Sequence, residues 1–144
     1  MHIRAYASRD AELLADIWLA ASLQAHPFVP AAYWQGNRAR MVAEYLPQSE
    51  NYVLEDSSGS LCGFISMLGR HIAALFIAPA AQGKGYGTAL LRHVQQLHDE
   101  LTLRVYALNT DSVHFYQYHG FCTTHSRTDP ATGAVELSMH WQKN

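Results

Sequence analysis

The feature of this 144-residue sequence that most restricts its fold is a glycine-rich segment between two apolar ones. Glycines alternate at positions 83, 85 and 87. The apolar run Ile72 to Ala78 before them is typical of a buried strand, and apolar side chains recur at helical spacing over residues 90–97. A further strand is expected over Leu101 to Leu108, and this order requires a parallel pair joined by a helical crossover. The segment therefore predicts a β-loop-α-β unit.

The rest of the chain predicts further strands and helices, without an internal repeat or linker. Two helices are expected early, over about residues 9–25 and 31–46, with Pro47 ending the second. Residues 56–60 have the chemistry of a hairpin loop, which favours antiparallel strands before the glycines. The expected strands cover residues 2–6, 51–55, 61–68, 72–78, 101–108, 121–127 and 135–141, and the last helix covers residues 111–119. The order βααβββαβαββ predicts a single α+β domain over residues 1–144 (α/β by looser usage), with a mixed sheet between helices.

Charge and hydropathy exclude two kinds of partner. Ten Lys and Arg residues against twelve Asp and Glu residues give a net charge of −2, and no basic run occurs, so nucleic-acid binding is not expected. No apolar run approaches the roughly 20 residues that cross a bilayer, and Met1 to Arg9 does not resemble a signal peptide. Cys62 and Cys122 both lie in stretches that look like buried strands, which suits a reducing compartment. We expect a cytoplasmic protein without a membrane partner.

Nine histidines raise the question of a metal site. The sequence has no His-Glu-x-x-His pattern and no paired cysteine spacing, and His114 and His119 are five residues apart, off one helix face. We therefore expect no metal.

The glycine segment has the properties of an anion site. Glycine lets the backbone approach a ligand closely, and a helix start offers unpaired N–H groups and a positive dipole end. Lys84 adds a cation nearby, although a simple connecting turn is the alternative. A P-loop does not fit because Gly85 follows Lys84 where Ser or Thr is required, and a dinucleotide fingerprint does not fit because Thr88 replaces its third glycine. The spacing thus disfavours a small ATP- or NAD-binding domain.

Two motifs carry a specific resemblance. Residues 82–87, Gln-Gly-Lys-Gly-Tyr-Gly, resemble the Gln/Arg-x-x-Gly-x-Gly/Ala signature of the GCN5-related N-acetyltransferase (GNAT) family. Residues 109–121 resemble the second motif of that family, with Asn first and Phe-Tyr and Gly-Phe later. Residues 26–28, 33–34 and 74–79 look most like the small bacterial members of the YjaB/YiaC type. The resemblance covers the whole chain and implies a mostly antiparallel seven-stranded sheet, about four flanking helices and a splayed parallel strand pair at the cofactor site.

The resemblance implies acetyl-CoA as the acyl donor. The backbone of Leu75, Phe76 and Ile77 would pair with the pantetheine arm, although these side chains also suit a core. Main-chain N–H groups of residues 82–88 would hold the pyrophosphate, and Asn109 would either bond the arm or cap a helix. Tyr118 stands where many members have a lysine near the 3′-phosphate, so that contact is not expected. The implied cofactor-binding residues are Leu75, Phe76, Ile77, Gln82, Gly83, Lys84, Gly85, Tyr86, Gly87, Thr88 and Asn109.

Tyr116 is the catalytic residue that the resemblance favours, as the general acid that protonates the leaving thiolate. Its phenol has a reference pKa of about 10 and stays protonated at neutral pH, while simple packing on one helix face is the alternative. No carboxylate occurs from His71 to Pro79, where many members carry a catalytic Glu. His71, with a reference pKa of about 6.5, is therefore the expected base or acceptor-side residue. A water relay and His26 stay open.

The sequence defines the site of the amine acceptor less closely than that of the acyl donor. His26, Phe28, Tyr33 and Trp34 lie between the first two helices, where the family forms one wall of the acceptor pocket, or they fasten those helices to the sheet. The resemblance implies transfer of acetyl to a primary amine of a protein lysine, an N-terminus or a small molecule, by direct attack on the thioester. A non-catalytic acetyl-CoA sensor is the alternative, and the protein is expected to be a monomer or homodimer.

Overall fold

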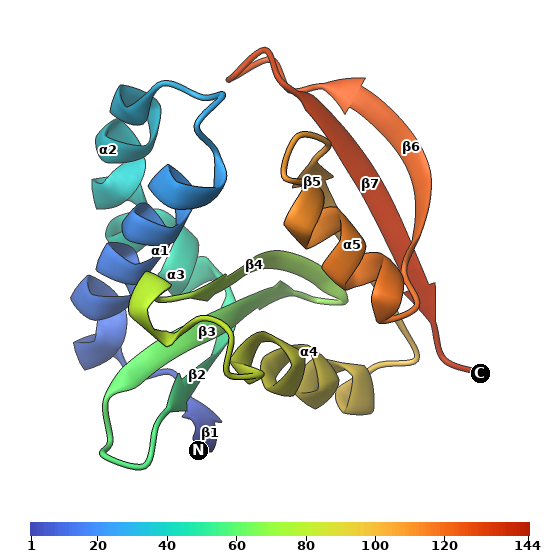
Figure 1. Ribbon diagram of the computed structural model, residues 1–144. Coiled ribbons are helices and arrows are strands. Elements are labelled where there is room, and N and C mark those ends of the chain that lie inside the picture. Colours follow the sequence, from blue (N-terminus) through green and yellow to red (C-terminus); the bar gives the residue numbers. More distant parts are fainter.

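The computed structural model describes residues 1–144 and contains one seven-stranded sheet, in the order β1-β2-β3-β4-β5-β7-β6 (Figure 1). β4 and β5 are parallel, and every other neighbouring pair is antiparallel. The strands are β1 (His2–Ala5), β2 (Glu50–Glu55), β3 (Leu61–Leu68), β4 (His71–Ile77), β5 (Glu100–Tyr106), β6 (Cys122–Thr128) and β7 (Val135–Gln142). The predicted strands and the mixed, mostly antiparallel sheet are confirmed.

The helices also follow the predicted order, with one difference. They are η1 (Ser8–Asp10), α1 (Ala11–Ala25), α2 (Ala31–Arg40), η2 (Met41–Tyr45), α3 (Leu46–Gln48), η3 (Pro79–Ala81), α4 (Tyr86–Leu97) and α5 (Thr110–Tyr118). The prediction that Pro47 ends the second helix was wrong: a π turn, η2, follows α2, and Pro47 lies inside α3. Proline is tolerated there because the N–H groups of a first helical turn need no intrahelical partner.

β4 and β5 separate soon after they meet. Their pairing is limited to His71 with Thr102 and Ile72 with Leu103. Beyond Ile72, β4 continues beside β3 alone, and a register shift after Ser66 bends this pair. A sheet edge that no strand covers has free N–H and C=O groups. The splayed parallel pair expected from the resemblance is therefore present, and it opens one side of β4.

Helices cover the sheet on both faces. The helices α1 and α2 pack against one face, where Trp18 and Trp34 are buried with Phe64. The helices α4 and α5 lie on the other face, where Leu90 and Tyr116 join the larger core. Burial of this apolar surface is the main force that holds the layers together.

A charged network fixes the start of α1 on the first two strands. Both carboxylate oxygens of Asp10 accept hydrogen bonds from Arg4, at 2.9 and 3.0 Å, and Arg4 also donates to Glu55 at 3.0 Å. The backbone N–H of Ala7 donates to the same Asp10 carboxylate at 2.9 Å. The Arg4 guanidinium lowers the pKa of Asp10, because it stabilises the ionised form of this buried group.

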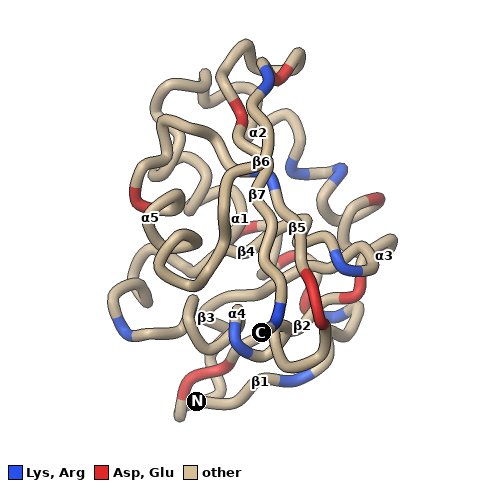
Figure 2. Tube along the Cα trace, turned by 90° about the vertical axis from the view of Figure 1, so that its right-hand side faces the viewer, with Lys and Arg blue, Asp and Glu red and all other residues tan.

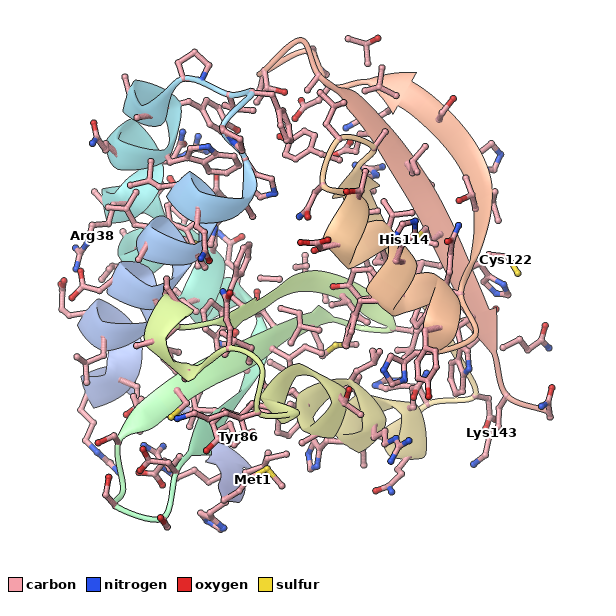
Figure 3. The ribbon with its side chains drawn as sticks, viewed as in Figure 1. Met1, Arg38, Tyr86, His114, Cys122 and Lys143 are labelled. Carbon is pink, nitrogen blue, oxygen red and sulfur yellow. The ribbon has the colours of Figure 1, made fainter.

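The two cysteines differ in exposure. Cys62 is buried as expected, but the prediction that Cys122 is buried was wrong. Cys122 begins β6, an edge strand whose residues are all exposed, and Figure 3 shows its side chain at the rim of the molecule. The residues that follow Cys122 in β6 are polar, so this edge strand has no apolar face to bury.

Basic and acidic residues are interspersed over the side of the molecule drawn in Figure 2, rather than gathered by sign. No helix combines the length and the apolar character that a membrane span requires.

Candidate active site

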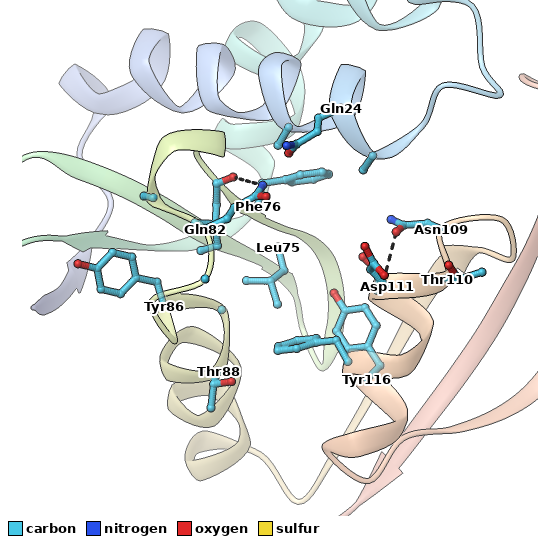
Figure 4. Close-up of a pocket in the computed structure, with 18 of the residues that line it drawn as sticks. Gln24, Leu75, Phe76, Gln82, Tyr86, Thr88, Asn109, Thr110, Asp111 and Tyr116 are labelled. Atoms are coloured by element: carbon cyan, nitrogen blue, oxygen red, sulfur yellow. Dashed lines mark hydrogen bonds between the residues drawn. The ribbon is translucent and has the colours of Figure 1, made fainter.

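A cleft of about 750 Å³ opens where β4 and β5 separate (Figure 4). Four parts of the chain form its walls: the end of α1, the second half of β4, the glycine segment with the start of α4, and the start of α5. Its volume lies in the range of small-molecule and cofactor sites. The cleft therefore brings together segments that are far apart in the sequence.

The glycine segment adopts the backbone geometry of an anion cradle. Gly83 and Gly85 have φ angles of 79° and 83°, in the left-handed region that glycine enters without strain. Gly85 immediately precedes α4, and the first α4 turn after it lines the cleft. The N–H groups of a first helical turn have no intrahelical acceptor, so Tyr86, Gly87 and Thr88 can offer theirs to an anion at the positive end of the helix dipole.

A side chain fastens this loop to β4. Nε2 of Gln82 donates to the backbone oxygen of Ile77 at 3.1 Å. All the expected cofactor-binding residues line the cleft except Lys84. The loop therefore faces the cleft with its backbone, while its one cationic side chain lies outside the lining.

Asn109 has two partners in the structure. Its Oδ1 accepts from the backbone N–H of Ser112 at 3.3 Å, so it caps α5, and its Nδ2 lies 3.3 Å from Nε2 of His26. Because Nδ2 can only donate, Nε2 of His26 is the acceptor of a neutral ring. Burial lowers the pKa of His26 to about 4, which keeps the ring neutral near pH 7. This contact joins the end of α1 to the start of α5.

The four residues expected at the acceptor wall form a packed aromatic cluster. His26 stacks on Trp34 with ring centroids 5.0 Å apart, and the edges of Phe28 and Tyr33 meet these two rings. His26 and Trp34 are buried, and Phe28 alone of the four lines the cleft. Tyr106 of β5 completes the cluster, 5.2 Å from His26. The cluster thus attaches α1 and α2 to the sheet.

Tyr116 combines packing with access to the cleft. Its ring lies 5.2 Å from that of Phe115 and 5.6 Å from that of Phe121. The residue also lines the cleft, and Figure 4 shows its hydroxyl directed into it. Burial raises the pKa of Tyr116, because desolvation disfavours the phenolate. Its hydroxyl therefore keeps its proton at neutral pH.

His71 lies away from the glycine loop. It is the first residue of β4, whereas Ile77 at the other end meets the loop, about 20 Å along a strand at 3.3 Å per residue. His71 does not line the cleft, and its Nδ1 lies 2.9 Å from Oγ1 of Thr102. Burial lowers its pKa.

The cleft also contains residues that the sequence analysis did not single out. Gln24 lines it near the end of α1, and Asp111 is the one carboxylate in its lining. Asp111 lies within the second motif, so the sequence already placed it near the site. The direction of its side chain could not be predicted, because it depends on how Asn109 caps α5. Gln24 carries no motif that could have marked it. No group of three or more His, Cys, Asp or Glu side chains is placed to hold a metal ion.

Gly87 provides a test of the cradle. A Cβ added there would lie 3.6 Å from the Phe115 ring, an ordinary contact, while occupying the cleft wall. Gly87→Ala should raise the free energy of unfolding by up to about 1 kcal/mol, because alanine is the better helix former. The added Cβ at the cleft wall should keep the diphosphate away from a main-chain N–H and so weaken coenzyme A binding about tenfold, the scale of losing one hydrogen bond to a charged group.

Gly36 of α2 is the matched control, because it is also helical, has no atom near an added Cβ, and lies outside the cleft. Gly36→Ala should stabilise the fold without changing coenzyme A affinity, measured by calorimetric titration. Unchanged affinity in Gly87→Ala would contradict the cradle.

Comparison with known proteins agrees with this geometry. The family model of the acetyltransferase (GNAT) domain matches residues 47–123, which include the glycine segment and the whole of the second motif. Peptidyl-lysine N-acetyltransferase YiaC of Escherichia coli (strain K12) is 38% identical over 127 residues, or 88% of this chain and 86% of YiaC. The solution structure of apo YjaB from Escherichia coli has a TM-score of 0.87 and 28% identity, covering 99% of this chain and 98% of YjaB.

A third protein shares the fold at lower sequence identity. The PaiA N-acetyltransferase of Thermoplasma acidophilum, crystallised in complex with coenzyme A, has a TM-score of 0.78 and 17% identity, covering 98% of both chains. The expected likeness to the YjaB/YiaC type is confirmed by the relatives above. The chain thus belongs to the GNAT family of acetyltransferases.

Proposed function

We propose that this protein transfers the acetyl group of acetyl-CoA to lysine side chains of protein substrates. The observation that carries the proposal is the cleft in which the free edge of β4, the glycine cradle and the Tyr116 hydroxyl converge. The relative YiaC is named as a peptidyl-lysine N-acetyltransferase, which supports a protein lysine over other amines. The matched relatives are named as enzymes, and the alternative of a non-catalytic sensor has no support among them.

The cleft suits acetyl-CoA in two ways. β4 lacks a β5 partner beyond Ile72, and in residues 75–77 the Ile77 carbonyl already accepts from Gln82. The other backbone groups on this edge can bond the amides of a pantetheine arm as an added strand would. Beyond the end of β4, the main-chain N–H groups of residues 82–88 would hold the diphosphate. In this arrangement the thioester lies near Leu75 and Tyr116, which face the same cleft.

The proposed reaction is direct transfer. The lysine nitrogen attacks the thioester carbonyl carbon, a C–N bond forms, and the C–S bond breaks. Tyr116 donates its phenolic proton to the departing sulfur as general acid, which typically contributes 10²–10⁴-fold. The lysine must lose a proton before attack, because its amine is mostly charged at neutral pH.

His71 is the base that we propose for this proton. Its neighbour Ile72 packs into the core on the α4 and α5 side, so the His71 side chain lies on the α1 and α2 face. As the base, His71 requires the acceptor to arrive from that face. Burial lowers its pKa, so the ring is neutral at pH 7 and free to accept a proton. A cytoplasmic location, the absence of a nucleic-acid partner and a monomeric or dimeric state stay predictions.

Replacing Tyr116 tests the general acid. Tyr116→Phe removes the proton donor and keeps the ring, so turnover should fall about 10²-fold or more while coenzyme A binding stays nearly intact. Tyr118→Phe is the control, because Tyr118 is two residues away and 85% exposed. A thiol-release assay on a lysine peptide measures both variants, and full activity in Tyr116→Phe would remove the assignment.

Replacing His71 tests the base through pH dependence. A base must be unprotonated, so wild-type kcat/KM should fall as pH drops through the pKa of His71, below its usual value of about 6.5. His71→Ala should lower kcat/KM and should shift or abolish this fall in kcat/KM at low pH. His2→Ala, at an exposed position on β1, should leave the profile unchanged. A wild-type profile in His71→Ala would exclude His71 as the base.

A further inference from the structure

A second cavity, of about 270 Å³, lies on the α1 face of β3 and β4. It is separate from the cofactor cleft but close to it along two elements. On β4, Ala74 lines the cavity and the next residue, Leu75, lines the cleft. On α1, Trp18 lines the cavity and Ala21 lines the cleft, less than one helical turn away. The cavity therefore adjoins the reaction site from the face on which His71 lies.

Two buried polar atoms near this cavity have no partner. Oγ of Ser66, which lines the cavity, and Oδ1 of Asn51 both lack a hydrogen bond, and the two residues are only 3% and 4% exposed. They are direct partners across β2 and β3, so their side chains lie on the same face of the sheet. Buried polar groups are nearly always paired, and an unpaired one is costly. Asn51 lies behind the lining, but Ser66 is part of it, so the unpaired Oγ of Ser66 fits a polar group that enters the cavity from outside the chain.

The walls of the cavity are mostly apolar. Its lining consists of Trp18, Met41, Tyr45, Gln48, Ser49, Ser66, Leu68, Ala73 and Ala74. The two alanines of β4 leave the space that larger residues would fill. Tyr45 and Leu68 are 39% and 49% exposed, so apolar groups also reach the surface here. The preferred occupant is therefore an apolar group that ends in one hydrogen-bonding group.

An unusual helical segment forms one side of the cavity. Met41 and Tyr45 are the first and last residues of the π turn η2. Single π turns are rare and occur frequently at functional sites. Here the turn directs α2 into α3 and gives the cavity two of its lining side chains.

We propose that this cavity binds a tyrosine side chain of the protein substrate, close in sequence to the acceptor lysine. The inference rests on the proposed function. The phenol ring would contact Trp18 and Met41, and its hydroxyl would form a hydrogen bond with Oγ of Ser66. An apolar cavity of about 150 Å³ holds benzene, so the volume suffices for a phenol. Because the cavity and the cleft adjoin at Ala74 and Leu75, the tyrosine should lie within about three residues of the lysine, a span of about 10 Å in an extended chain.

A peptide panel tests this proposal on the full-length protein. Each peptide has one lysine, with tyrosine, phenylalanine or alanine at one of the three positions on either side. At one of these positions, tyrosine should raise kcat/KM about tenfold over alanine, the scale of burying one aromatic ring. Phenylalanine should lie about threefold or more below tyrosine, because it leaves Oγ of Ser66 unpaired.

Two serine variants separate the cavity from a general effect. Ser66→Ala should remove most of the difference between tyrosine and phenylalanine peptides, with unchanged rates on alanine peptides and unchanged coenzyme A affinity. Ser22→Ala is the matched control, because its hydroxyl is also buried and unpaired but lies outside both cavities. It should keep the tyrosine preference.

Equal rates on tyrosine and alanine peptides at every position would overturn the proposal, and the cavity would then hold water only. An equal preference for tyrosine over phenylalanine peptides in Ser66→Ala and Ser22→Ala would also overturn the proposal. A failure of the proposed function would give a different result: no lysine peptide would be acetylated, whereas small amines would be.

Discussion

The short pairing between β4 and β5 is the constraint on which the other features depend. Two residue pairs hold the strands together, and beyond Ile72 one edge of β4 has no strand partner. Backbone N–H and C=O groups need partners, so this edge is prepared for a ligand that supplies them. The same separation creates the cleft, places the glycine segment at the end of β4, and lets Tyr116 face β4 from α5.

The two halves of β4 line different cavities. Leu75, Phe76 and Ile77 line the cleft, whereas Ala73 and Ala74 line the smaller cavity. The boundary falls between Ala74 and Leu75, whose side chains point to opposite faces of the sheet. An acyl donor in the cleft and a protein substrate at the smaller cavity can then meet at a single strand, without competing for the same surface.

The order of strands and helices was predictable from the sequence, because it follows from local periodicity and turn chemistry. The glycine motif and the second motif together also marked half of the cleft lining. The link between His26 and Asn109, and the unpaired atoms of Ser66 and Asn51, were not predictable, since they depend on register between distant segments. Cys122 was misjudged because sequence alone does not distinguish an edge strand from a central one.

The central claim is that main-chain amides of the glycine segment hold the coenzyme diphosphate. The most direct measurement is a ¹H–¹⁵N NMR titration with coenzyme A and, separately, with pantetheine, which lacks the diphosphate. Coenzyme A should shift the amide signals of residues 83–88 and 75–77, and pantetheine should shift those of residues 75–77 alone. Saturation with coenzyme A that leaves residues 83–88 unmoved would contradict the account.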